Sequence, residues 1–315
     1  MAKKKEKNDN NILYLLLVVV LSVVGFIFGY ESDFYGGVKT FIDDTFGDEI
    51  KEVETLSADV KVYFMDVGEA DAILINSNGK YVLIDSGNNA DGDNLVEYMK
   101  EKGVKKLDYV IGTHAHEDHI GGMDNVIRAF DIGTFYMPKT VVPTLTYEDI
   151  IKALKNKGYK YSVPKVGTTF TVGKSKFEVM YIGNDVEEQN NDSIVIKMTY
   201  KNRSFLFTGD LPTEKELTIL DKDIKADVLK VAHHGSRYSS SYQFLNKVDA
   251  KYAVISCGKL NDYNHPHNQL LKRLNKLKMK VYRTDLRGTI IFSTDGDNIN
   301  IISENTNINV EEDKK

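Results

Sequence analysis

From residue 58 onward, short runs rich in Val, Ile, Tyr and Phe alternate with turns that contain Gly, Asn or Asp. Runs of this composition, bounded by turn residues, predict β-strands. The first strands are predicted over residues 60–66, 72–75, 81–85 and 107–111. Further strands are predicted over residues 176–182, 193–200, 203–208, 227–232 and 252–256.

Helical periodicity appears between these strands. Residues 147–157 place apolar side chains on one face and predict a helix with Thr146 as its N-cap. Thr213 and Glu216 have the spacing of a capping box and predict the start of another helix. Two groups of strands with interspersed helices predict one α/β domain over residues 58–304, with two packed sheets and helices outside.

A different pattern precedes this domain. Residues 12–30 carry no charged side chain, and roughly 20 apolar residues suffice to cross a bilayer as a helix. Lysines precede the run and acidic residues follow it, so the positive-inside tendency places the N-terminus in the cytoplasm. We therefore expect a single-pass membrane protein with an extracytoplasmic domain. Its segments are a basic tip and transmembrane anchor at 1–30, a juxtamembrane tether at 31–57, the domain, and a polar tail at 305–315.

A cleaved signal peptide is the alternative reading of the N-terminal run, and it makes the domain a secreted protein.

Composition limits the function further. The net charge of −5, from 41 basic and 46 acidic residues, argues against a protein that holds nucleic acid by a broad basic surface. Cys257 is the only cysteine, which excludes an intrachain disulfide and a cysteine-rich zinc site.

All seven histidines fall in three short clusters beside turn residues: His114, His116 and His119; His233 and His234; His265 and His267. The first cluster directly follows a predicted strand and contains Glu117 and Asp118. Histidine and carboxylates are common metal ligands, and two histidines two residues apart can converge on one ion. Every cluster follows a predicted strand, so we expect one edge of the sheets to gather them.

The motifs resemble those of the metallo-β-lactamase superfamily. The similarity lies in Asp85 within Leu-Ile-Asp-Ser-Gly, the turn from His114 to His119, Asp210 within Thr-Gly-Asp, and a later histidine. Lys-Val-Ala-His-His-Gly-Ser, Asn-His-Pro and Tyr-Arg-Thr-Asp further resemble the hydrolase domain of the ComEC competence proteins. The resemblance implies an αββα sandwich of two mixed sheets and a hydrolase that activates water with two divalent ions, zinc or manganese.

The resemblance also implies the ligands: His114, His116, Asp118, His119, Asp210 and His234. Asp210 would bridge the ions, one histidine of the pair His233–His234 would bind metal, and the other would orient it or handle protons. Asp85 would support the histidine turn by hydrogen bonding. The predicted catalytic residues are Asp118, His234 and His265. Either His265 or His267 would protonate the leaving group or line the substrate pocket, and His267 is alternatively a surface residue at a helix start. Residues that contact the anionic substrate or support the ligands are Asp192, Ser193, His233, Ser236 and Arg283.

Three departures from the family pattern matter. Gly68-Glu69-Ala70-Asp71 stands where these domains usually have Gly-Gln-Gly-Asp. No histidine lies between His119 and His233, so the first ion lacks its usual third histidine. Asp192, Asn191 or water can fill that place, which would make the site richer in oxygen and favour manganese. Finally, the chain has one predicted span and no polytopic channel.

These features favour a hydrolase of phosphodiester bonds, with DNA as the leading substrate, that contacts the membrane through its N-terminal helix. One alternative is a cell-envelope phosphoester or ester hydrolase with the same site. Another is a non-catalytic metal-binding accessory module of a membrane DNA-uptake system.

Overall fold

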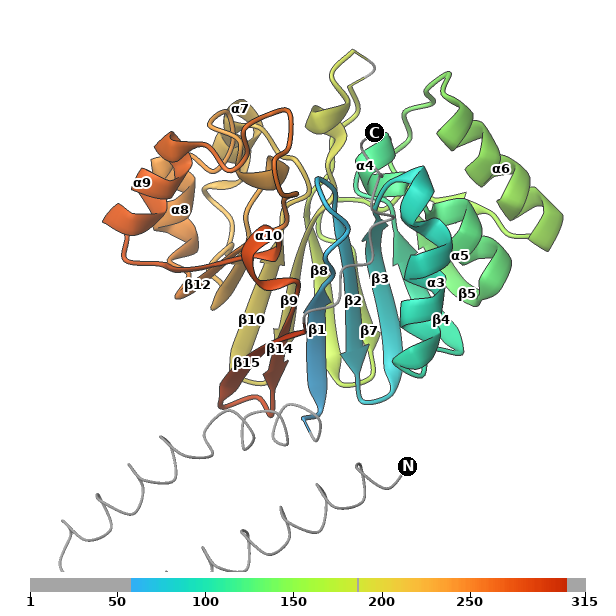
Figure 1. Ribbon diagram of the computed structural model, residues 1–315, viewed down its shortest axis with the longest axis horizontal. Helices are drawn as coiled ribbons and strands as arrows, with labels where there is room; N and C mark the ends of the chain where they lie inside the picture. The colour runs from blue at the N-terminus through green and yellow to red at the C-terminus, as the bar shows by residue number, and fades with distance from the viewer. Residues whose placement is uncertain (1–57, 186, 305–315) are drawn as a thin grey trace, which may run out of the picture. The chain divides into compact units, whose positions relative to one another are not determined.

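A computed structural model describes residues 58–185 and 187–304, which belong to the compact unit Thr55–Lys315 (Figure 1). One mixed sheet has eight strands in the order β15-β14-β1-β2-β3-β4-β5-β6. Its strands are β1 (Val60–Phe64), β2 (Ala72–Ser77), β3 (Lys80–Ser86), β4 (Lys106–Ile111), β5 (Asp131–Tyr136), β6 (Tyr161–Ser162), β14 (Thr289–Thr294) and β15 (Ile299–Glu304). The neighbours from β3 to β6 are parallel, and the other pairs are antiparallel.

The second mixed sheet has seven strands in the order β13-β12-β11-β10-β9-β8-β7. Its strands are β7 (Thr169–Val172), β8 (Ser175–Tyr181), β9 (Val195–Tyr200), β10 (Arg203–Phe207), β11 (Val228–Lys230), β12 (Tyr252–Ile255) and β13 (Lys280–Arg283). The pairs from β10 to β13 are parallel, and those from β7 to β10 are antiparallel. The predicted sandwich of two mixed sheets is therefore confirmed.

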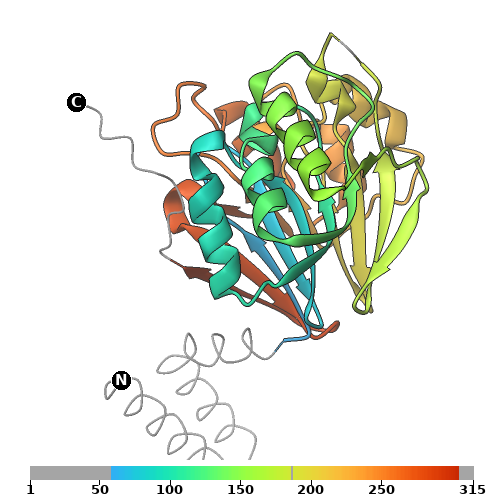
Figure 2. The same ribbon diagram turned by 90° about the vertical axis from the view of Figure 1, so that its right-hand side faces the viewer.

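Helices cover the outer face of each sheet, as Figures 1 and 2 show. The eight-stranded sheet carries α3 (Gly92–Glu101), α4 (Glu117–Ile120), α5 (Met123–Ala129) and α6 (Leu145–Lys157). The C-terminal half contributes α7 (Thr213–Glu216), α8 (Tyr242–Val248), α9 (Asn268–Lys276) and α10 (Thr284–Arg287). In the part of the chain that the structure describes, no helix is long and apolar enough to span a bilayer. The predicted anchor, tether and tail lie outside the described residues.

The apolar runs divide between two layers because strand side chains alternate between faces. In β1, Val62 and Phe64 enter the core between the sheets, whereas Tyr63 packs in the core under α3, α5 and α6. The Phe64 ring meets Phe292 edge-on, with 5.7 Å between centroids, and meets Phe207 of the other sheet at 6.3 Å. Burial on both faces explains why the strands read as continuous apolar runs.

Two predicted helix starts are wrong in detail. The cap of α6 is Thr144, whose side chain accepts a hydrogen bond from the Tyr147 N–H, while Thr146 lies inside the first turn. The capping box is absent from α7, where Pro212 occupies the cap position. Glu216 instead accepts the N–H groups of Ser240 and Ser241, so its carboxylate holds the chain that follows the histidine pair.

Candidate metal centre

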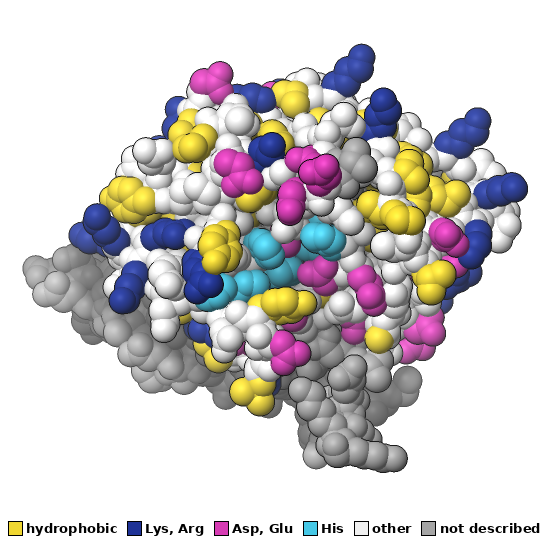
Figure 3. Space-filling view, turned by 90° about the horizontal axis from the view of Figure 1, so that it is seen from above, with side chains coloured by type: hydrophobic (Ala, Val, Ile, Leu, Met, Phe, Trp, Pro, Cys, Tyr) yellow, Lys and Arg dark blue, Asp and Glu magenta, His cyan; other side chains and the backbone are white. Residues whose placement is uncertain are grey.

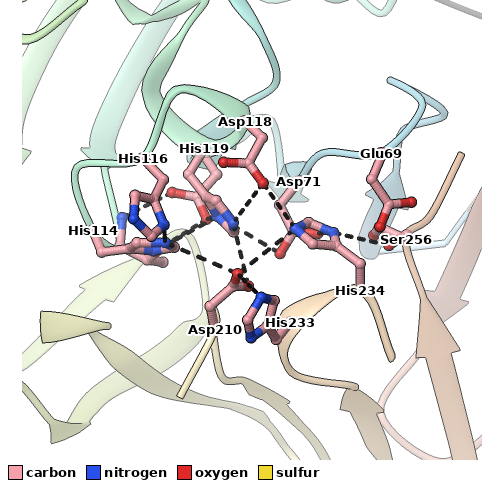
Figure 4. Close-up of polar contacts among 12 residues, drawn as sticks. Glu69, Asp71, His114, His116, Asp118, His119, Asp210, His233, His234 and Ser256 are labelled. Carbon is pink, nitrogen blue, oxygen red and sulfur yellow. Dashed lines mark hydrogen bonds and ion pairs between the residues drawn. The ribbon is translucent and has the colours of Figure 1, made fainter. Parts of the chain in front are cut away.

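The histidine clusters meet at the edge of the sandwich where parallel strands end (Figure 4). His114 and His116 lie between β4 and α4, and Asp118 and His119 lie on α4. Asp210 follows β10, and the 3-10 turn His233–Gly235 follows β11. The loops of the two sheets pack closely. A Cβ added to Gly209 would lie only 3.0 Å from the Thr113 side chain. The topology therefore gathers residues from distant parts of the sequence at one point.

Four residues form the tightest group. The ligand atoms of Asp118, His119, Asp210 and His234 all lie within 4.8 Å of one another. His234 Nε2 lies 3.1 Å from Asp118 Oδ2, and His119 Nε2 lies 3.2 Å from Asp210 Oδ1. His119 Nε2 and Asp210 Oδ1 are buried and have no hydrogen-bond partner. Imidazole and carboxylate atoms that face a common point in this way fit a divalent metal ion.

A second group lies on the other side of Asp210. His114 Nε2 and His116 Nδ1 approach to 3.0 Å, the arrangement expected of two rings that share one ion. Asp210 Oδ2 lies 4.0 Å from His114 Nε2, 3.8 Å from His233 Nε2 and 3.7 Å from His234 Nε2. The carboxylate of Asp210 thus stands between the two groups, and both histidines of the pair reach it.

Three of the supporting residues predicted from the sequence make local contacts. Asp192 Oδ1 accepts the Asp185 N–H at 2.5 Å, a contact within its own loop. His233 Nε2 lies 3.8 Å from Asp210 Oδ2, so His233 can supply a further nitrogen to the centre. The Arg283 guanidinium pairs with Asp285, with Nη2 2.5 Å from Oδ2. Ser236 Oγ accepts the N–H of Tyr238 at 3.3 Å.

Other residues hold the ligands from behind. Asp85 accepts hydrogen bonds from Thr113 N and Oγ1, both at 2.8 Å, and lies 2.9 Å from His119 Nδ1. Ser193 Oγ accepts the Asp210 N–H at 3.0 Å. His234 Nδ1 lies 3.1 Å from the Ser256 carbonyl oxygen, to which it can only donate. That contact leaves Nε2 of neutral His234 as the metal-binding nitrogen.

Sequence reasoning missed a buried ion pair behind the histidines. Lys230 Nζ lies 2.7 Å from Asp71 Oδ2, and the side chains are 0% and 1% exposed. Asp71 also lies 3.6 Å from His234 Nδ1 and 3.9 Å from His119 Nδ1. The available signals were the acid in the Gly-Glu-Ala-Asp segment and a lysine inside an apolar strand. Because these residues are far apart in sequence, their pairing required the fold.

Lys230→Met should lower the free energy of unfolding by about 3–5 kcal/mol, since it removes the nearest cation from the buried Asp71 carboxylate. Urea denaturation measures the effect. Lys225→Met is the matched control, because Lys225 pairs with Asp249 at the surface and its side chain is 69% exposed. A loss from Lys230→Met no larger than that of this control would contradict a structural role for the buried pair.

The carboxylates control protonation of the histidines. Burial alone lowers the pKa of His234, but Asp210, Asp118 and Asp71 together raise it to about 9. His119 is likewise buried, and Asp210, Asp118 and Asp85 hold its pKa well above 6.5. Burial and the neighbouring His119 keep the pKa of His114 well below 6.5, so His114 is neutral and ready to bind an ion.

Metal binding should therefore release protons, and its affinity should rise between pH 6.5 and about 9, because His234 must lose its proton to bind. The folding stability of the ion-free protein should instead fall as the pH rises. The contribution of protonated His234 to stability is fully present below pH 6.5 and is lost as the pH rises through about 9. Titration calorimetry in buffers with different ionisation enthalpies counts the protons. An affinity independent of pH across this window would contradict the assignment.

His265 lies beside the centre and is held by a residue that the sequence did not single out. His265 Nδ1 lies 2.6 Å from Glu69 Oε1, and Glu69 Oε2 accepts the Gly258 N–H at 2.8 Å. The His265 ring is 5.6 Å from that of His233 and 6.2 Å from that of His234, between centroids. Glu69 therefore orients His265 with Nε2 as the nitrogen left for a substrate. Viewed from above, the histidines form a patch bordered by acidic and apolar side chains (Figure 3).

Comparison with known proteins agrees with this geometry. Residues 65–259 match the model of the metallo-beta-lactamase superfamily, and the chain belongs to that superfamily. It is therefore related to metal-dependent hydrolases, and its clustered histidines and aspartates are suited to binding metal ions.

The chain is similar to two larger bacterial proteins. It is 32% identical to ComE operon protein 3 of Bacillus subtilis, over 75% of this chain and 33% of that protein. It is 30% identical to Recombination protein 2 of Haemophilus influenzae, over 72% of this chain and 28% of that protein. The chain thus spans about a third of the length of these relatives. The structure of Igni18, a metallo hydrolase of Ignicoccus hospitalis, shares the fold with a TM-score of 0.52 at 17% identity, over 74% of this chain and 99% of that one.

Proposed function

We propose that this protein is a hydrolase that uses two divalent ions, zinc or manganese, to cleave phosphodiester bonds, with DNA as the leading substrate. One observation carries the proposal: Asp210 lies within 3.2–4.0 Å of ring nitrogens from four histidines, two from each of the two histidine-bearing turns. A negatively charged carboxylate between two metal sites reduces the repulsion between the two dications.

The residues fall into two ligand sets with Asp210 in common. His114, His116 and His233 would hold one ion, and Asp118, His119 and His234 would hold the other. When bound, two such ions supply an activated water at neutral pH and neutralise the charge that develops on the phosphoryl group. His265, oriented by Glu69, would donate a proton from Nε2 to the leaving oxygen. The side chain of Asp118 is 31% exposed, so a substrate can reach the centre beside this carboxylate.

The choice of substrate rests on the relatives. Proteins named for competence and recombination match most of this chain, which supports a nucleic acid as the substrate. The same relatives support an association with a membrane DNA-uptake system. In that setting residues 12–30 would anchor the domain outside the cytoplasm.

Hydrolysis assays test this proposal. The substrates are a single-stranded oligonucleotide, a duplex, bis(4-nitrophenyl) phosphate and 4-nitrophenyl acetate, each with Mn²⁺ or Zn²⁺. We expect metal-dependent cleavage of the phosphodiesters. Hydrolysis of the carboxylic ester alone would contradict the proposed substrate. No hydrolysis of any substrate by metal-loaded protein would contradict the proposed catalytic role.

A further inference from the structure

Exposed aromatic and apolar side chains border the metal centre. Tyr238 is 64% exposed, Tyr263 is 67% exposed, and Leu260 is 96% exposed. All three lie in the segments that follow β11 and β12, the strands that lead into the histidine-bearing loops. Figure 3 shows apolar side chains directly beside the histidine patch. Large aromatic rings presented to solvent at the mouth of a polar site are suited to binding a planar ligand.

A series of ring contacts joins Tyr263 to the centre. Its ring stacks on His265 with 5.6 Å between centroids and 19° between planes. His265 in turn contacts the rings of His233 and His234, at 5.6 and 6.2 Å. The His265 ring therefore links Tyr263 to His233 and His234, so a flat group lying on Tyr263 would be next to the metal centre.

An arginine side chain packs on the ring of a second exposed tyrosine. Arg237 lies over the Tyr238 ring, with Cζ 4.9 Å from the centroid, and its Nη2 donates to the Tyr238 hydroxyl at 3.1 Å. The Arg237 N–H donates to His267 Nδ1 at 3.2 Å, and the ring of His267 lies 4.9 Å from that of His265. Tyr263 and Tyr238 thus both lie next to the loop that carries His265 and His267.

The loop that carries Tyr263 is braced. Asn261 Nδ2 donates to the carbonyl oxygens of Gly258 and His265, at 2.9 and 2.7 Å, and its Oδ1 accepts the His265 N–H at 2.9 Å. Glu69 fastens both ends of the same loop through Gly258 and His265. A ring held in place before the ligand arrives loses little entropy on binding.

We propose that Tyr263, together with Tyr238 and Arg237, stacks on an unpaired base next to the phosphodiester held at the metal centre, so that the substrate is a single strand. The inference rests on the proposed phosphodiesterase function. Base faces are available for side-chain stacking in single strands and are covered in a duplex. The net charge of −5 also favours recognition by stacking over a broad electrostatic contact with a duplex.

The test compares Tyr263→Leu with the wild-type chain on two single strands: a normal one, and one with an abasic position beside the scissile bond. We expect Tyr263→Leu to raise KM about tenfold for the normal strand and to leave the abasic strand unaffected. Tyr263→Phe keeps the ring and should behave as wild type. Tyr242→Leu is the matched control, since Tyr242 is 40% exposed on α8 and contacts Lys276.

Equal effects of Tyr263→Leu on both strands would overturn the proposal, because they would indicate disturbance of His265. Unchanged kinetics on both strands would also overturn it and would favour a protein-binding role for this surface. Fluorescence anisotropy with a labelled phosphorothioate strand separates this test from the proposed function. If the wild-type protein cleaves neither strand, the proposed function fails, while tenfold weaker binding by Tyr263→Leu would still support the stacking surface.

Discussion

Asp210→Asn should lower the turnover of a phosphodiester by roughly 10³-fold or more, because charge stabilisation by bound ions contributes several kcal/mol to catalysis. Among the residues that the structure describes, Asp210 is the carboxylate that lies within 4.0 Å of ring nitrogens in both histidine groups. The amide keeps the shape of the side chain but removes the negative charge between the ions. Steady-state kinetics with saturating Mn²⁺ measure the loss.

Asp223→Asn is the control for this substitution. Its side chain is 84% exposed and pairs with Lys197 on the surface, so turnover should stay at the wild-type value. Circular dichroism of both variants checks that the fold is retained. If folded Asp210→Asn protein with the same metal content turns over as fast as wild type, Asp210 does not bridge the ions.

Removal of the ions should abolish hydrolysis and lower the melting temperature. A ligand present at 100 times its dissociation constant stabilises the folded state by about 2.7 kcal/mol. For a domain of this size, each kcal/mol corresponds to about 2–4 °C, so chelation should lower Tm by roughly 5–10 °C. Differential scanning calorimetry before and after chelation gives the shift, and added Mn²⁺ or Zn²⁺ should restore both Tm and activity.

The same scans with Asp210→Asn provide a control for non-specific effects of the chelator. This variant should show a much smaller shift, because both ions lose a shared ligand. An equal decrease in Tm on chelation for the wild type and the variant would indicate that the ions bind elsewhere in the chain.

The sequence was informative for the strands and turns around the site, whereas local signals misplaced the caps of α6 and α7. Alternation and apolar runs predicted the strands around the site, because each run is short and bounded by turn residues. The spacing from His114 to His119 and the strand-end position of Asp210 also indicated one common edge. The parallel strands place these residues there, and the family match supports the same interpretation.

Long-range partners were beyond such reasoning. Nothing near Lys230 in the sequence indicates that its ammonium pairs with Asp71, and Glu69 meets His265 only after folding. Asp192, Asn191 and water were the sequence-based candidates for the open place at the first ion, and only the fold shows that Asp192 Oδ1 accepts the Asp185 N–H within its own loop. His233 could not be separated from His234 by sequence, and in the structure Nε2 of each ring lies near the same oxygen of Asp210, at 3.8 and 3.7 Å.

The most direct test of the two-ion centre is the metal content of the purified protein by mass spectrometry, with Asp210→Asn measured beside it. We expect two zinc or manganese ions per wild-type chain and a clear reduction in the variant. At most one ion per fully loaded wild-type chain, or equal content in the two proteins, would contradict a dinuclear centre built around Asp210.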